Sequence, residues 1–244
     1  LNLSLTGNGN KYCPNNIEIG SDNSIWVSTT NSVVYGDGGG TVFQSTNGVN
    51  FVLKNYIQDA GRTQIALSAN NPNKIYVLVQ DGATGEADIY LTTNSFTNLN
   101  PVSEPAGIHG TSATDFCRGQ AFYDLMIGMN PTNDSEVYVG GIEIFKNTDA
   151  FKASPVAGDW SQLTDWTVNP TANGNATANS LDGVHSDHHV MAFCPSQTSR
   201  VVFGCDGGVY YSNNSGNSIG ERNKDYNVTQ VYKGSIDQSI AGNK

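Results

Sequence analysis

Hydrophobic residues come in short runs separated by polar turns along this chain, and one arrangement of runs recurs. An apolar run is followed by an Asn-Pro type turn and then by a second apolar run that usually carries an aromatic residue. The clearest copies occupy residues 64–79, 125–139 and 190–203, and an earlier copy at 17–27 lacks the proline. Short apolar runs bounded by Asn, Pro and Gly are typical of β-strands joined by tight turns. The pattern therefore predicts an all-β protein.

Each copy continues into a third short strand that ends in a polar turn. These third strands are residues 42–44, 89–91, 144–146 and 209–211. The central-strand positions Tyr76, Tyr138 and Val202 are 62 and 64 residues apart, whereas a minimal four-stranded blade takes roughly 40 to 50 residues. The spacing implies insertions between the units, and the richest in turn-forming residues are 86–88, 101–119 and 169–183.

A repeated meander of three or four strands predicts a β-propeller, because one such unit cannot bury both of its faces and must stack on its neighbours. A Greek-key sandwich is the alternative, but it does not predict the same cassette four times. We expect one propeller segment over residues 1–244, with an incomplete set of about four to five blades. The expected blades are approximately 15–54, 63–100, 120–168 and 187–225, and a further blade begins within 226–244.

The composition supports a globular, turn-rich protein and excludes some partners. Hydrophobic residues make up 37% of the chain and charged residues only 14%, while 27 residues are glycine. The net charge of −10 repels phosphate backbones, so nucleic acid is not expected as a partner. Since no apolar run approaches the roughly 18 residues needed to cross a bilayer, direct membrane insertion is not expected either.

The four cysteines are Cys13, Cys117, Cys194 and Cys205. They show no CxxC spacing, which argues against a zinc knuckle or a thioredoxin-type site. Cys194 and Cys205 flank an apparent hairpin around residues 195–199, so we expect a disulfide between them. A second bridge between Cys13 and Cys117 is a further candidate. The alternative is that all four are small buried hydrophobic residues.

The polar turns after the third strands resemble degenerate Asp boxes, the Ser-x-Asp-x-Gly-x-Thr-Trp turns of sialidases, sortilins and related BNR-type propellers. The best match is 45–51, with Asn47 where the family has Asp and Phe51 where it has Trp. Such a turn caps its own backbone amides with a side-chain oxygen and packs a ring between strands. The resemblance therefore implies a structural role for these turns.

Two longer stretches resemble propellers of secreted, multidomain bacterial surface proteins. They are 119–149, similar to a GQGWYD, VYVGG and KSTD series, and 184–210, similar to HxDxHxLAF and GNDGGVY segments. Those propellers commonly carry Asp and Asn where Cys194 and Cys205 stand, which favours a bridge between the two cysteines. Residues 229–236 resemble the first strand of a next blade. The resemblance covers most of residues 15–235 and implies an extracellular location.

His185, Asp187 and His189 alternate along the start of a predicted strand, with His188 on the opposite side. Such a trio is a candidate site for a divalent metal. Five extended residues span about 13 Å from end to end, so the three side chains cannot easily reach one ion. A hydrogen-bond network at the entrance to the central channel is therefore the favoured interpretation. We expect no cofactor, although a bound calcium or other divalent cation is left open.

Catalytic chemistry is limited to two candidate carboxylates. A sialidase would need three arginines around a carboxylate, and the four arginines of this chain, Arg62, Arg118, Arg200 and Arg222, show no such arrangement. Xyloglucanase-type glycosidases of related architecture use two carboxylates beside a cleft, and Asp124 and Asp187 are the candidates by position. The alternative is that each caps the start of a strand. The glycine-rich stretch 36–40 lacks the Lys-Ser/Thr of a phosphate loop and is expected to be a hairpin turn.

These observations predict a non-catalytic extracellular propeller that acts as a scaffold or as a binding module for glycans or proteins. Loops on a rigid frame are where such folds place function. One alternative is a glycoside hydrolase of the xyloglucanase type, and another is a purely structural subunit of a surface assembly. The expected partners are the remainder of the same polypeptide or a partner chain that completes the propeller, with glycans or surface proteins as possible ligands.

Overall fold

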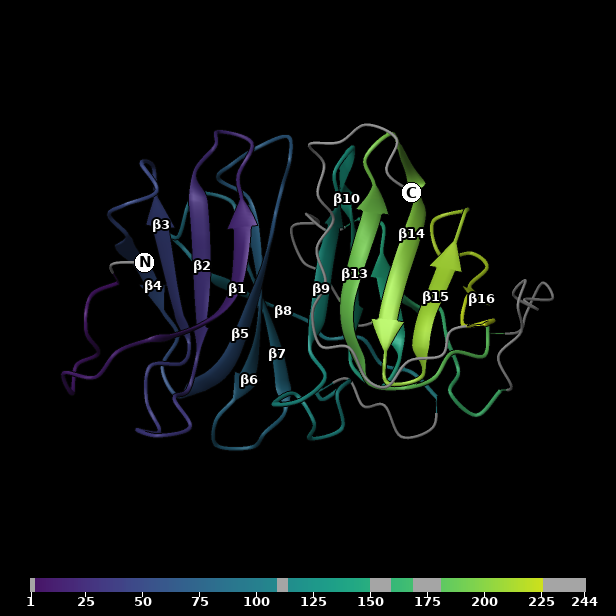
Figure 1. Cartoon of the computed structure of the whole chain (residues 1–244), viewed down its shortest axis with the longest axis horizontal. Coiled ribbons are helices and arrows are strands. Elements are labelled where there is room, and N and C mark those ends of the chain that lie inside the picture. Colours follow the sequence, from purple (N-terminus) through teal and green to yellow (C-terminus); the bar gives the residue numbers. More distant parts are fainter. Residues whose placement is uncertain (1–2, 109–113, 150–158, 169–180, 226–244) are drawn as a thin grey trace.

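The computed structural model describes residues 3–108, 114–149, 159–168 and 181–225, and it confirms the all-β propeller (Figure 1). Every named element in these ranges is a β-strand, and the sixteen strands form four antiparallel sheets. Each sheet contains four strands that are consecutive in the sequence. Each sheet is therefore one blade, and no strand crosses from one blade to another.

The strands have the following bounds. Blade 1 contains β1 (Cys13–Ile19), β2 (Ile25–Thr30), β3 (Thr41–Ser45) and β4 (Val52–Tyr56). Blade 2 contains β5 (Ala60–Leu67), β6 (Ile75–Asp81), β7 (Ala87–Thr92) and β8 (Asn100–Val102). Blade 3 contains β9 (Met126–Asn130), β10 (Asn133–Gly140), β11 (Ile144–Asn147) and β12 (Trp160–Gln162). Blade 4 contains β13 (His188–Cys194), β14 (Gln197–Cys205), β15 (Gly208–Ser212) and β16 (Gly220–Glu221).

The first strand of each blade is the innermost. β1 contacts β5, β5 contacts β9, and β9 contacts β13, so these four strands lie in order around the axis. Blades 1 and 4 lie at the two ends of the series (Figure 1). Residues at the starts of the four inner strands are consequently brought near one another although they are far apart in the sequence.

Three of the four hydrophobic clusters are interfaces between neighbouring blades. Trp26 and Val42 of blade 1 pack with Ile65 and Val77 of blade 2. Blades 2 and 3 share a larger cluster, and Tyr138 of blade 3 packs with Phe203 and Tyr210 of blade 4. The stability of the propeller therefore comes from burying apolar side chains between blades, at about 25 cal/mol per Å² of apolar surface removed from water.

Both outward faces of the series are only partly covered, and on blade 1 Ile17 and Ile19 are 53% and 62% exposed. On blade 1, Tyr12 packs edge-on against Phe43 with 5.0 Å between the ring centroids, and Leu3 joins the same cluster. Residues 3–12 thus cover part of that face. On blade 4, Val190 and Val202 remain 58% and 40% exposed. Blade 4 therefore presents an apolar sheet face that the described residues do not cover.

Hydroxyl and amide side chains close the turns after three of the third strands. In each, the amide oxygen of an asparagine accepts backbone N–H bonds and a hydroxyl two residues earlier accepts another; the pairs are Ser45 with Asn47, Thr92 with Asn94, and Ser212 with Asn214. The acceptor distances lie between 2.8 and 3.0 Å. Three blades therefore share one turn chemistry.

The connections separate the two ends of the propeller. Short turns after the first and third strands lie at one end, which we call the turn face. Connections into the first and third strands lie at the other end, which we call the loop face; their described residues are 31–40, 57–59, 82–86, 103–108, 114–125, 141–143, 163–168, 181–187 and 206–207. Hydrogen bonds between loops of different blades support this placement, including Gly82 N to the Asp59 carbonyl (2.8 Å) and His188 N to the Gly141 carbonyl (2.9 Å).

The structure corrects the expected disulfides, because all four cysteines are free. The hairpin turn is tighter than expected, so Cys194 pairs with Gln197 and Cys205 with His188, at opposite ends of the β13–β14 pair. Six residues of strand separate those ends by about 20 Å, whereas a disulfide needs Cα atoms within about 7 Å. Cys13 lies on blade 1 and Cys117 lies just before blade 3, with blade 2 between them. In the described part of the chain, no helix is long and apolar enough to cross a bilayer.

Candidate functional site

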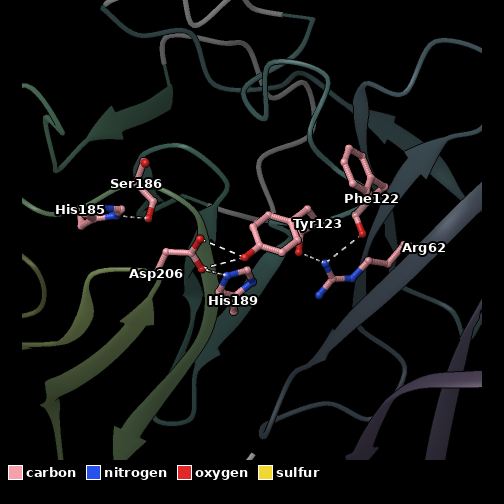
Figure 2. Close-up of polar contacts among 7 residues, drawn as sticks. All are labelled: Arg62, Phe122, Tyr123, His185, Ser186, His189 and Asp206. Atoms are coloured by element: carbon pink, nitrogen blue, oxygen red, sulfur yellow. Dashed lines mark hydrogen bonds and ion pairs between the residues drawn. The ribbon is translucent and has the colours of Figure 1, made fainter. Parts of the chain in front are cut away.

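A loop over residues 117–124 leads into the first strand of blade 3 and lies at the axial side of the loop face. Arg62, on the first strand of blade 2, donates to the backbone carbonyls of Phe122 (3.5 Å) and Tyr123 (Figure 2). Burial lowers the pKa of this guanidinium, and the nearby charge of Asp124 opposes the shift. Arg62 therefore ties blade 2 to the loop of blade 3.

Tyr123 ties the same loop to blade 4. Its hydroxyl lies 3.0 Å from each carboxylate oxygen of Asp206, and Nε2 of His189 lies 2.8 Å from Oδ1 of the same carboxylate. The rings of Tyr123 and His189 meet edge to face, with 4.9 Å between their centroids. Tyr123, Asp206 and His189 thus form one polar network that joins blades 3 and 4 (Figure 2).

The backbone of the loop is set at its start by Asp115. Its Oδ1 accepts the Cys117 N–H at 3.1 Å and its Oδ2 accepts the Gly119 N–H at 2.5 Å. Arg118 and Gly119 both adopt left-handed backbone conformations, with φ of 52° and 76°. A left-handed conformation is unusual for arginine, and the carboxylate cap offsets part of that strain.

Asp124 lies beneath this loop and is completely buried. Neither of its carboxyl oxygens has a hydrogen-bond partner among the described residues. Burial and the neighbouring charge of Asp187 raise the pKa of Asp124 to about 8, against smaller lowering effects of its own backbone N–H and of Arg62. A carboxyl in this environment is protonated at neutral pH, because burial disfavours its ionised form.

His188 is a second buried group at the same end of the propeller. It is fully buried, and neither ring nitrogen has a partner in the described part of the chain. Burial, with smaller contributions from His189 and His185, lowers the pKa of His188 to about 3. The ring is therefore neutral over most of the pH range.

A pocket of about 350 Å³ opens on the loop face between blades 3 and 4. Its lining residues are Arg118, Gln120, Ile142, Trp166, Ser186 and Asp187. Trp166 is 46% exposed, so an indole face is available beside a guanidinium, an amide and a carboxylate. Pockets with one aromatic surface and a few polar groups are typical of small-ligand sites.

Glu143 supports this pocket from below. It is almost fully buried, accepts the Thr164 hydroxyl at 2.6 Å and the Trp166 N–H at 3.0 Å, and so holds the start of the 163–168 segment. Burial raises the pKa of Glu143 to about 7, while the bonds from Thr164 and Trp166 act in the opposite direction. The position of Trp166 therefore depends on a buried carboxyl group.

The predicted site residues fall into two groups. Asp124 and Asp187 come close enough for the charge of Asp187 to raise the pKa of Asp124, but one is buried and the other lines the pocket. The expected alternation of His185, Asp187 and His189 does not occur, because β13 begins at His188 and Asp187 has a φ of 67°. The His185 ring faces the Ser186 carbonyl (3.1 Å, Figure 2). Among the described residues, no three His, Cys, Asp or Glu side chains converge to hold a metal.

Several residues at this site were not predicted from the sequence, among them Arg62, Tyr123, Asp206 and Trp166. Arg62, Tyr123 and Asp206 act through contacts between blades that only the tertiary structure creates, and Trp166 lies in the connection after β12, at the end of the expected third blade. A signal was present for two of them, because Tyr123 and Asp206 lie within the two family-like stretches. Nothing in the sequence marked Arg62 or Trp166.

Comparison with known proteins supports the fold. No protein-family model matches the sequence, and no curated protein matches it. Among solved structures, an ancestral GH74 enzyme is 14% identical over 86% of this chain and 24% of its own length, with a TM-score of 0.55. At this identity the similarity shows a shared β-propeller fold and nothing further.

Other solved propellers are similar at lower TM-scores. A GH74 enzyme of Niastella koreensis is 16% identical over 86% of this chain and 36% of its own length, with a TM-score of 0.47. A structure of YCF48 bound to the D1 peptide is 11% identical over 90% of this chain and 68% of its own length, with a TM-score of 0.43. The chain spans between 24% and 37% of the length of the GH74 structures.

Proposed function

We propose that this chain is a non-catalytic, extracellular glycan-binding module whose ligand occupies the pocket between blades 3 and 4. The observation that carries the proposal is the half-exposed Trp166 beside Arg118, Gln120 and Asp187 in a pocket of about 350 Å³. The apolar face of a sugar ring packs on an indole, and its hydroxyls pair with amide, carboxylate and guanidinium groups. The pocket offers each of these partners on a rigid frame.

The extracellular, Asp-box type of propeller is part of the proposal. It is supported by the shared hydroxyl and asparagine turns, whose side-chain oxygens cap backbone amides at Ser45 and Asn47, Thr92 and Asn94, and Ser212 and Asn214. These turns stabilise blades and take no part in ligand binding. The loop face alone carries the proposed function.

Affinity electrophoresis tests the proposal, with xyloglucan, cello-oligosaccharides coupled to the gel, and chitin oligosaccharides as separate probes. We expect retarded migration in at least one gel, and loss of that retardation in Trp166→Ala. Phe122→Ala is the matched control, since Phe122 is 62% exposed on the same face and does not line the pocket. No retardation in any gel, or equal loss in both variants, argues against a glycan site. A stable partner chain that co-purifies without glycan binding would favour the structural-subunit alternative.

A glycoside hydrolase is the second candidate function, and the pair of Asp124 and Asp187 favours it. A carboxyl with its pKa raised to about 8 near a second carboxyl that lines a pocket is an arrangement suited to general acid catalysis. Asp124 is completely buried beneath its loop, however, so it contacts no ligand in this arrangement, and binding is the better supported function. New reducing ends from xyloglucan, abolished in both Asp124→Asn and Asp187→Asn, would establish hydrolysis instead.

We also propose that a further blade, from the same polypeptide or a partner chain, covers the outer face of blade 4. The support is the exposure of Val190 and Val202, in contrast to the buried interfaces between the other blades. Val202→Glu in the intact protein is expected to lower the melting temperature, because it would bury a charge at that interface. Thr30→Glu, at a partly buried strand end on blade 1, is the comparison. An unchanged melting temperature for Val202→Glu would show that the face is exposed.

A further inference from the structure

A second pocket, of about 340 Å³, opens on the loop face between blades 1 and 2, whereas the Trp166 pocket lies between blades 3 and 4. Its side-chain lining includes Asn31, Asp37, Tyr56 and Asp59, and glycine backbone supplies much of the remainder. A Cβ at Gly39 would lie 2.5 Å from the Ala60 carbonyl oxygen. Glycine therefore allows the 31–40 loop of blade 1 to rest directly on the backbone of blade 2, which fixes the walls of the pocket.

One carboxylate of the pocket and the backbone that carries the other are held in place. Oδ2 of Asp37 accepts bonds from Thr6 (2.9 Å), Asn8 (3.1 Å) and Asn10 (3.1 Å), while its Oδ1 is shielded and has no partner among the described residues. Asp59 has a φ of 58°, and its carbonyl accepts the Gly82 N–H at 2.8 Å. The Asp37 carboxylate is thus positioned by the 3–12 segment and the backbone of Asp59 by its contact with Gly82, independently of any ligand.

The pocket is negative without a compensating positive charge. Among the described residues no lysine, arginine or histidine lines it. The nearest arginine in the sequence, Arg62, is engaged with the backbone of Phe122 and Tyr123. Hydrogen bonds from Thr6, Asn10 and Asn8 outweigh burial and lower the pKa of Asp37, so this carboxylate is ionised at neutral pH.

We propose that this pocket binds the guanidinium group of an arginine side chain presented by a basic polypeptide partner. The guanidinium is planar, forms paired hydrogen bonds with carboxylates, and stacks on aromatic rings. Asp59 supplies the carboxylate for these bonds, Asp37 adds a second negative charge whose oxygens are engaged by the 3–12 segment or shielded, and Tyr56, 58% exposed at the rim, supplies the ring. The chain itself carries an excess of acidic residues, 22 against 12, which favours association with a basic partner.

The size of the pocket favours a guanidinium group over a bare metal ion as its ligand. A single water takes about 30 Å³ of liquid volume, and a bare calcium ion, whose ligands are the walls of its site, needs no larger space. A volume of about 340 Å³ is suited to an organic side chain. In addition, two carboxylates line the pocket among the described residues, whereas calcium takes about six to eight oxygen ligands.

Isothermal titration of the whole chain with two blocked pentapeptides, Gly-Gly-Arg-Gly-Gly and the same peptide with citrulline in place of arginine, tests the proposal. Citrulline keeps the shape of arginine but has no charge. We expect saturable binding of the arginine peptide, at least about tenfold weaker binding of the citrulline peptide, and weakening with added salt. Equal binding of the two peptides, or no saturable binding, would overturn the proposal.

Three variants place the effect in the pocket. Asp59→Asn keeps the left-handed backbone, which asparagine adopts readily, and should weaken arginine binding about tenfold. Tyr56→Leu should weaken it by a smaller factor, and Asp22→Asn, on the turn face, should leave it unchanged. Unchanged affinity in Asp59→Asn, or a saturable calcium titration in a protein that ignores the arginine peptide, would overturn the assignment. Glycan binding at Trp166 is measured separately by affinity electrophoresis, so a failure of one proposal does not affect the other.

Discussion

The Tyr123 hydroxyl lies 3.0 Å from both carboxylate oxygens of Asp206, which is 83 residues away in the sequence. The contact joins the entry loop of blade 3 to the β14–β15 turn of blade 4. Because Arg62 of blade 2 donates to the backbone of the same loop, three blades are connected at one end of the axis by two side chains. The rigidity of the loop face therefore depends on polar contacts in addition to the apolar interfaces between blades.

Tyr123→Phe removes the hydroxyl and should lower the free energy of unfolding by about 1 kcal/mol, since a hydrogen bond to a charged group at a partly exposed site is lost. Urea denaturation measures the change. Tyr35→Phe is the matched control, because Tyr35 is 59% exposed on the same face, and it should stay within about 0.5 kcal/mol of the parent. The double variant Tyr123→Phe with Asp206→Asn tests whether the two residues are coupled. Coupling is shown if the double variant loses only as much free energy of unfolding as each single variant does.

The stability of the protein should fall as the pH rises from about 5 to 9. The pKa values of Asp124 and Glu104 are raised to about 8 and about 9, mainly by burial, so the folded state keeps protons that the unfolded state has released. Each such group makes stability fall with pH by up to about 1.4 kcal/mol per pH unit between its ordinary pKa and its raised one. The lowered pKa of His188 acts in the opposite sense, and only below about pH 6.5, where the unfolded state takes up a proton that the folded state does not.

Asp124→Asn should flatten this pH profile between about pH 4 and 8, because asparagine does not ionise. Melting temperatures at pH 5, 7 and 9 measure the effect. Asp22→Asn should leave that range unchanged, since bonds from Ser24 lower the pKa of Asp22 and confine its titration to more acidic solution. A parent profile that rises toward pH 9 would show that Asp124 is ionised in the folded protein.

Thiol labelling of the native protein should modify Cys194 before Cys205 and Cys117. Hydrogen bonds from Ser196 lower the pKa of this partly exposed thiol, whereas burial raises the pKa of Cys205 to about 12 and that of Cys117 well above its ordinary value. The thiolate is the reactive form. Peptide mass mapping after brief iodoacetamide treatment tests the order, and Cys194→Ser should delay the first modification. A peptide linking Cys194 to Cys205 would contradict the register of β13 and β14.

Gly141→Ala should destabilise the protein by about 1 to 3 kcal/mol through overpacking. A Cβ at this position would lie 2.5 Å from Sγ of Cys117, which is fully buried. Cys117→Ala should restore part of the loss by making space, and thermal denaturation of the single and double variants shows whether it does. Gly7→Ala is the control, because no atom lies within 4 Å of its added Cβ. Equal effects of Gly141→Ala and Gly7→Ala would rule out the close contact.

Local patterns predicted the blades, because each blade is made of strands that are neighbours in the sequence. The central strands around Tyr76, Tyr138 and Phe203 are apolar runs whose aromatic residues became the blade interfaces. The pairing register of the strands was harder to predict from the sequence. The turn between β13 and β14 has two residues and not the expected five, and this difference places Cys194 away from Cys205. The alternation assigned to His185, Asp187 and His189 failed for a related reason, since the strand begins three residues later than the pattern suggested.

The site was only partly predictable, because its contacts join blades that are distant in sequence. Asp124 and Asp187 were identified by their positions before first strands, and the structure shows that their environments differ: one is buried without partners and the other lines a pocket. No periodic pattern in the sequence predicts that Arg62 contacts a loop 60 residues later. Such contacts follow from the stacking geometry of the blades and from no local feature of the chain.

The pairing of each strand only with its neighbours in the sequence has a consequence for biosynthesis. All of blade 1 has been made by residue 56, and each later blade is finished before the next begins. Local pairings form quickly, while a single blade still needs a neighbour to bury its apolar face. A chain emerging from the ribosome can therefore dock each new blade onto the one before it, and none of the sixteen described strands waits for a distant partner.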